Sequence, residues 1–140
     1  AETGAIAEYL LAKHDPDHTL HPRADSADFP RYLEWVHAAE GAIFLPGLFR
    51  FYLMNAGLLD TPLAASMEAE QAKAMKTIEG HLAKHAYFAG DSFTAADCLM
   101  AFQVQSAAAM GALKALPATR AWLEKVQARP AYKAMLDVGV

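Results

Sequence analysis

Apolar residues recur every three or four positions along most of the chain, which is the spacing of one face of an α-helix. No stretch alternates between apolar and polar residues like a half-buried strand, and no two-residue turn joins two such stretches. The chain is therefore predicted to be all-α, a helical bundle of about five to six helices. The spacing places these helices at about residues 3–13, 28–55, 64–83, 94–111, 116–128 and 130–136.

Prolines and turn-forming residues mark where these helices begin, bend and end. Residues 14–22 are dense in turn formers and have no periodicity, which indicates a linker whose Leu20 could anchor on a neighbouring surface. Pro30 is tolerated only in the first turn of a helix, so the long second helix begins close to it. Pro46 lies inside the same helix, where a bend is expected.

The sharpest local signal is the pair Thr94 and Asp97, which precedes an uncharged apolar segment. A threonine followed three residues later by an acid is the capping box. The Thr94 hydroxyl can accept the Asp97 N–H, and the Asp97 carboxylate can accept the Thr94 N–H. Because the helix that follows is too apolar for the surface, we expect both residues to have a structural role. A catalytic role for Asp97 is not favoured.

Composition and charge then limit the class of protein. The 140 residues are 54% hydrophobic and 20% charged, which suits one domain with a core that needs neither metals nor disulfides. A net charge of -4 offers no basic surface to nucleic acid or to anionic membranes. The longest uncharged run falls short of the roughly 20 apolar residues that a bilayer span requires. Neither nucleic acid nor a membrane is expected as a partner.

The linker contains a cluster of potential metal ligands. Three histidines, His14, His18 and His21, lie near Asp15 and Asp17. Their spacing is not helical, and the prolines among them argue against a preformed tetrahedral site. We therefore expect solvated linker histidines and no metal.

Cys98 is the only cysteine, so an internal disulfide is excluded. A lone cysteine fits a reducing compartment, and a cytoplasmic location is expected. Its neighbours Leu99, Met100 and Phe102 predict burial, and we expect an inert packing role for the thiol rather than a nucleophilic one.

Several segments, in order, resemble the glutathione S-transferase family. Gly90–Asp97 is similar to the segment that opens the buried helix of the family's C-terminal domain, and residues 2–10 are similar to the segment that closes its thioredoxin-like domain. The turn at residues 20–22 resembles the interdomain linker. Residues 32–41 and 120–132 resemble the first long helix and the closing helices of bacterial members.

The resemblance implies a domain organisation. Residues 1–13 are expected to be the last helix of a thioredoxin-like N-terminal domain, 14–24 an interdomain linker, and 25–140 the C-terminal helical domain. The chain does not begin with Met, and its first residues look like a helix already in progress. We therefore expect a fragment of a longer protein.

The same resemblance implies a function. Members add the thiol of glutathione, their co-substrate, to small hydrophobic electrophiles in detoxification, and they form homodimers, here expected through the first two long helices. The family's catalytic Tyr, Ser or Cys lies early in the thioredoxin-like domain, so no catalytic residue is expected in this chain. Reduction, isomerisation and dehalogenation with glutathione remain open. So does a non-catalytic helical scaffold or protein-interaction module.

The resemblance also suggests binding residues. The family's glutathione-binding pair maps to Glu2 and Thr3, and a helix N-terminus suits the α-carboxylate of the tripeptide. The alternative is that Thr3 is a plain N-cap beside a solvated Glu2. A pocket wall for the electrophile is expected on one face of the first long helix, although such a stripe also fits an ordinary core or dimer face. Its residues are His37, Gly41, Phe44, Leu45 and Leu48.

Overall fold

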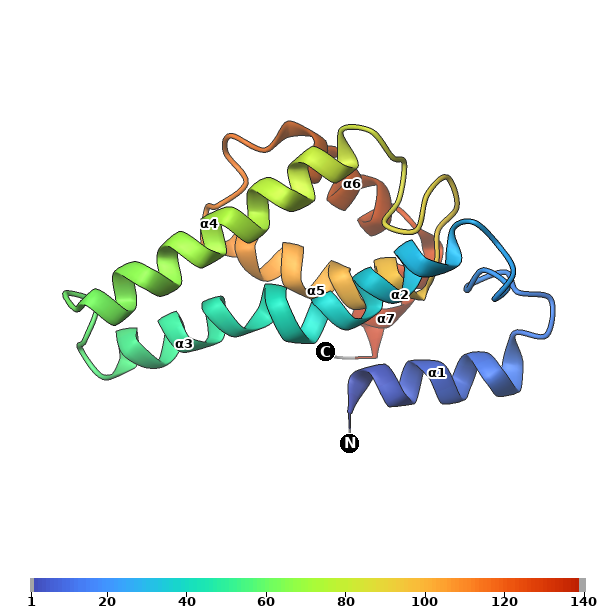
Figure 1. Ribbon diagram of the computed structural model, residues 1–140, viewed down its shortest axis with the longest axis horizontal. Coiled ribbons are helices and arrows are strands. Elements are labelled where there is room, and N and C mark those ends of the chain that lie inside the picture. Colours follow the sequence, from blue (N-terminus) through green and yellow to red (C-terminus); the bar gives the residue numbers. More distant parts are fainter. Residues whose placement is uncertain (1, 139–140) are drawn as a thin grey trace.

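The structure, a computed structural model, describes residues 2–138 (Figure 1). Over this range it is entirely helical, as predicted, and contains no strand. The helices form six continuous runs, because α2, a π-helical turn η1 and α3 follow one another without a break. The elements are α1 (Thr3–His14), α2 (Phe29–Ala38), η1 (Ala39–Ile43), α3 (Phe44–Asn55), α4 (Pro62–Leu82), α5 (Ala95–Ala109), α6 (Pro117–Gln127) and α7 (Pro130–Asp137).

Helix α5 is the central element of the bundle. It contacts α2 and η1 on one side and α6 on another, while α3 and α4 pack along each other as a long helical pair (Figure 1). Nine of its 15 residues are buried, and Met100 and Val104 have no exposed surface. Helix α1 lies apart from the bundle and meets it mainly at α5 (Figure 1). The buried helix predicted from the capping box is thus confirmed.

The core beside α5 is closed by aromatic rings around Phe88. This residue is fully buried, and its ring centroid lies 4.7 Å from that of Trp35 on α2 and 4.8 Å from that of Trp122 on α6. Aromatic pairs at this separation attract each other beyond the area that they bury. The turn before α5 therefore joins α2 to α6 through the core.

The long second helix is irregular one turn earlier than expected. A bend was predicted at Pro46, but this residue lies in the first turn of α3, and the departure from α-helical geometry is the π turn η1. Pro46 has no N–H to donate to the carbonyl four residues earlier, and its ring crowds that carbonyl. A wider turn just before the proline relieves both problems. It also rotates α3 relative to α2.

The capping box lies at the start of α5, and its acid has more partners than predicted. One oxygen of Asp97, Oδ2, accepts the Thr94 N–H at 2.9 Å and the Thr94 hydroxyl at 3.2 Å. The other, Oδ1, accepts the Phe88 N–H at 3.1 Å and the Trp122 indole N–H at 3.0 Å. The carboxylate thus joins the start of α5 to the turn before it and to Trp122 on α6, 25 positions further along the chain.

Asp97 has no exposed surface. Burial raises the pKa of this carboxyl above its ordinary value, while the hydrogen bonds from Thr94, Phe88 and Trp122 act in the opposite direction. A buried acid with every oxygen in hydrogen bonds to donors of the core has no free lone pair for chemistry. The expected structural role of Thr94 and Asp97 agrees with this geometry.

We predict that Asp97→Ala lowers the free energy of unfolding by about 3–5 kcal/mol, because it leaves several buried donors without an acceptor. Urea unfolding followed by circular dichroism measures this loss. The matched control is Asp91→Ala, which removes an exposed acid from the same loop and should change stability by less than about 0.5 kcal/mol. A similar small effect of both substitutions would contradict the central role of Asp97.

Candidate functional site

The N-terminus of α1 is open to a ligand. Glu2 occupies the N-cap position with an extended backbone, and among the described residues its side chain makes no capping hydrogen bond. Thr3 is exposed and is the first helical residue, so the alternative of a Thr3 N-cap is wrong. The first-turn N–H groups and the positive end of the helix dipole are therefore available to an anionic group such as a carboxylate.

Most residues of helix α1 are not buried against the bundle. Leu11 is its only buried residue in the described part of the chain. Three large apolar side chains on the helix, Ile6, Tyr9 and Leu10, are 48%, 62% and 48% exposed. An uncovered apolar surface of this kind is typical of a segment that packs against further protein.

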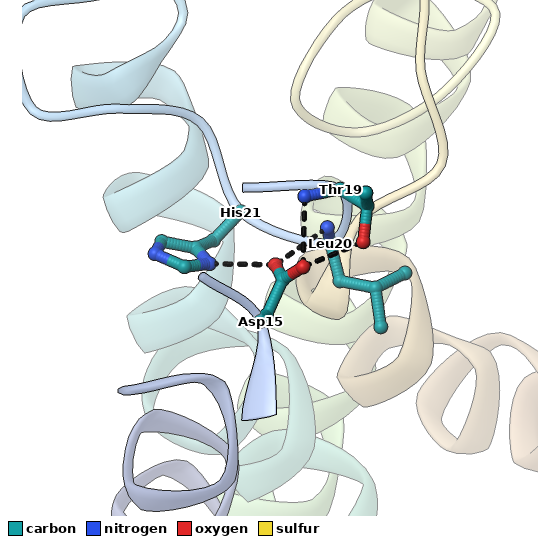
Figure 2. Close-up of polar contacts among 4 residues, drawn as sticks. All are labelled: Asp15, Thr19, Leu20 and His21. Carbon is teal, nitrogen blue, oxygen red and sulfur yellow. Dashed lines mark hydrogen bonds and ion pairs between the residues drawn. The ribbon is translucent and has the colours of Figure 1, made fainter. Parts of the chain in front are cut away.

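The segment after α1 is organised by the Asp15 side chain, which is buried (Figure 2). Oδ1 of Asp15 accepts the Thr19 N–H at 2.9 Å and the Thr19 hydroxyl at 2.6 Å. Oδ2 accepts the Leu20 N–H at 2.8 Å and lies 2.9 Å from Nδ1 of His21. We call Asp15 with Thr19, Leu20 and His21 the linker clamp. It gives a segment without regular structure a defined conformation.

The clamp keeps the Asp15 carboxylate ionised, and it is hydrogen-bonded to the start of α5. Burial alone would raise the pKa of Asp15, but the hydrogen bonds from Thr19, Leu20 and His21 hold it well below its ordinary range. The Leu20 carbonyl then accepts the N–H of Ala95, the first residue of α5, at 2.7 Å. Leu20 anchors the linker as expected, through its backbone rather than through its exposed side chain.

The prediction of solvated linker histidines is correct for one of the three. His14 is exposed, but His18 and His21 are half-buried, and their ring centroids lie 4.4 Å apart. The error arises because the clamp folds the linker back on itself, which residue spacing alone does not reveal. Within residues 2–138, no three side chains of the types that bind metals are grouped as a metal site.

The residues of the predicted pocket wall do not all lie at one cavity. Phe44 and Leu48 line an open cavity of about 440 Å³ between α3, α4 and α5, together with Met75, Phe102 and other apolar side chains. His37, Gly41 and Leu45 are exposed and do not line it. The five residues therefore do not share one face: Leu45 lies in α3 beside Phe44 but points about 100° away around the helix axis, and His37 and Gly41 come before α3.

The exposed side of this helix offers space as well. Apart from its two chain neighbours and the backbone of its own helix, no atom of the described residues lies within 4 Å of the place that a Cβ on Gly41 would occupy. Gly41 thus leaves room beside η1, although Gly41 does not line the cavity that Phe44 and Leu48 line.

The expected burial of Cys98 is wrong. Cys98 is exposed on the first turn of α5, and Phe102, four residues later on the same face, is 61% exposed. The neighbouring apolar residues Leu99 and Met100 point into the core, and they misled the prediction. Poor hydration of the thiol and the adjacent Asp97 raise the pKa of Cys98, so it is protonated at neutral pH and a weak nucleophile.

No helix within residues 2–138 combines the length and the apolar character that crossing a bilayer demands. This finding agrees with the absence of a long apolar run in the sequence.

Comparisons with known proteins identify the family. Residues 45–130, more than half of the chain, match the sequence model described as "Glutathione S-transferase, C-terminal domain". Glutathione S-transferase 3 of Zea mays is 35% identical over 94% of this chain and 63% of its own length. Glutathione S-transferase 3 of Schizosaccharomyces pombe is 29% identical over 93% of this chain and 59% of its own length. The chain thus spans about three fifths of these relatives.

The fold agrees with the sequence match. A glutathione transferase homolog from Lodderomyces elongisporus, solved with two GSH per subunit, superposes with a TM-score of 0.87. The alignment covers 100% of this chain and 67% of that one at 18% identity, which establishes a shared fold. From the match over residues 45–130 and the shared helical architecture, the chain belongs to the glutathione S-transferase C-terminal domain family.

Proposed function

We propose that the chain is the helical part of a glutathione transferase that conjugates glutathione to small hydrophobic electrophiles. In this proposal a thioredoxin-like domain supplies the catalytic residue, residues 1–13 are its last helix, 14–24 form the interdomain linker and 25–140 the helical domain. Membership of the family and the names of the two relatives support an enzyme over a non-catalytic module. The observation that carries the proposal is the open N-terminus of α1.

The proposed glutathione-binding residues are Glu2 and Thr3. An exposed N-terminal turn can donate N–H groups to the α-carboxylate of the γ-glutamyl end, and the Glu2 carboxylate can face its α-ammonium group. The uncovered apolar side chains of α1 fit contact with a thioredoxin-like domain. In the Lodderomyces structure GSH is present, which supports glutathione as the co-substrate.

The proposed electrophile pocket involves the helix that runs from α2 to α3. Phe44 and Leu48 supply the apolar cavity, and such a cavity suits a hydrophobic ligand. His37, Gly41 and Leu45 would contact the electrophile from the exposed side of the helix, where Gly41 leaves space.

A homodimer is proposed through α3, α4 and the loop between them. This region carries a run of large apolar side chains that are about half exposed, more than isolated surface residues would explain. They are Phe49, Phe51, Tyr52, Met54, Leu58, Leu59 and Leu63.

In the protein that includes the thioredoxin-like domain, Glu2→Ala should weaken glutathione binding about 10- to 100-fold, because one charge-assisted hydrogen bond is lost. Isothermal titration calorimetry measures the Kd. Glu124→Ala removes an exposed acid on α6 and should leave the Kd unchanged. Absence of glutathione binding by the unaltered protein would refute the enzyme, and equal Kd values for both variants would refute the role of Glu2.

For the pocket, Leu48→Ala should raise the KM for a hydrophobic electrophile about 10-fold with little change in the KM for glutathione, because it removes apolar contact area. Steady-state kinetics with each substrate varied in turn measures the effect. Leu136→Ala on α7 is the control, since this leucine lies away from the cavity and is 52% exposed. If Leu45→Ala raises the KM and Leu48→Ala does not, the electrophile binds on the exposed side instead.

For the dimer, Leu63→Glu should weaken self-association at least about 100-fold, because a two-fold interface buries the new charge in both subunits. Sedimentation velocity over a range of concentrations measures the dissociation constant. Leu136→Glu places the same charge on α7 and should have no effect. A monomeric unaltered protein would disprove the proposed dimer.

A further inference from the structure

We propose that Asp15 is a positioning residue, which sets the orientation of α1 on the helical domain and so the place of the α1 N-terminus. Asp15 would not touch glutathione. It would act through the linker clamp, and its effect on glutathione binding rests on the proposed function of Glu2 and Thr3.

The first argument is the way α1 is attached. Its one described buried residue, Leu11, lies in its last turn, and the clamp begins directly after its final residue, His14. The 12 residues of α1 make a rod of about 18 Å. A rotation of about 10° at the attached end moves the free end by about 3 Å, which is enough to break a hydrogen bond. The direction of α1 thus depends on the geometry of the clamp.

The second argument is the completeness of the clamp. Each carboxylate oxygen of Asp15 has two partners, supplied by three consecutive residues (Figure 2). The outer end of this loop is bound to α5, because the Leu20 carbonyl accepts the Ala95 N–H. The loop also holds His18 at φ 55, in the left-handed region that residues other than glycine rarely adopt. Such a conformation persists only where the surrounding contacts determine it.

The third argument is what the clamp connects. It joins the end of α1 to the first N–H of α5, the same helix start that Thr94 and Asp97 organise. One end of the clamp therefore lies on the most buried part of the bundle and the other on the helix that carries Glu2. A simple turn would need no link to the core.

The orientation of α1 can be measured in this chain. Spin labels on the native Cys98 and on an Ala5→Cys substitution report the distance between α5 and α1, and both positions are exposed. Asp15→Ala should broaden the distance distribution at least about two-fold in width. Asp17→Ala, which removes an exposed acid two residues later, should leave the distribution as narrow as in the unaltered chain.

The functional consequence is measured in the protein with its thioredoxin-like domain. Asp15→Ala should raise the KM for glutathione about 10-fold while kcat stays within two-fold, because the site is displaced but its chemistry is intact. A residue that merely stabilises the fold would lower the active fraction, and hence kcat, without changing KM. Asp15→Asn keeps one carbonyl oxygen for Thr19 and should show an intermediate KM.

Two outcomes overturn the proposal. One is a distance distribution for Asp15→Ala as narrow and as centred as that of the unaltered chain, and the other is an unchanged KM for glutathione in a protein in which Glu2→Ala does weaken glutathione binding. If the unaltered protein does not bind glutathione, the proposed function fails, whereas the distance measurement still decides the orientation of α1. If Asp15→Ala does not fold, Thr19→Val removes only the 2.6 Å hydroxyl contact and must itself broaden the distribution.

Discussion

The fold depends on one buried carboxylate. Asp97 accepts four hydrogen bonds at the point where the turn before α5, the first turn of α5 and the middle of α6 meet. A hydrogen bond to a charged group in the interior contributes more than one on the surface, and losing such a partner costs more still. The rings of Trp35 and Trp122 can close on Phe88 because Asp97 holds the Phe88 backbone in place.

Two other acids use the same principle. Glu79 on α4 accepts the N–H groups of Ala118 and Thr119 and the Thr119 hydroxyl, at 2.8–3.0 Å, and so caps α6 from another helix. Burial would raise the pKa of Glu79, but these bonds lower it overall. Asp15 likewise accepts several hydrogen bonds from the linker. Each carboxylate lies where a bend leaves several N–H groups pointing in one direction. Within residues 2–138 these acids join the helices through hydrogen bonds, and no ion pair joins two helices.

The helices and the capping box could be predicted from the sequence because both depend on residues that are close in the chain. Periodicity located all six helical runs, and the spacing of Thr94 and Asp97 located the start of α5. The contacts of Asp97 with Trp122 and of Glu79 with Thr119 span 25 and 40 positions, and no local pattern reveals them. The candidate site was harder to predict from the sequence than the fold. Exposure of Cys98 depends on which helix face has a neighbour, and the lining of the cavity depends on how α3, α4 and α5 pack, which sequence spacing does not show.

The π turn lies between two halves of the long helix, α2 and α3, whose side chains face different neighbours. An α-helix advances about 100° per residue, so one extra residue in a turn changes which side chains the following half presents to each neighbour. Helix α2 keeps Tyr32, Trp35 and Val36 in the core, while α3 directs Phe44 and Leu48 to the cavity. Substitutions in α3 can therefore alter the cavity without disturbing the core packing of α2. A single continuous helix thereby serves the core with its first half and the cavity with its second.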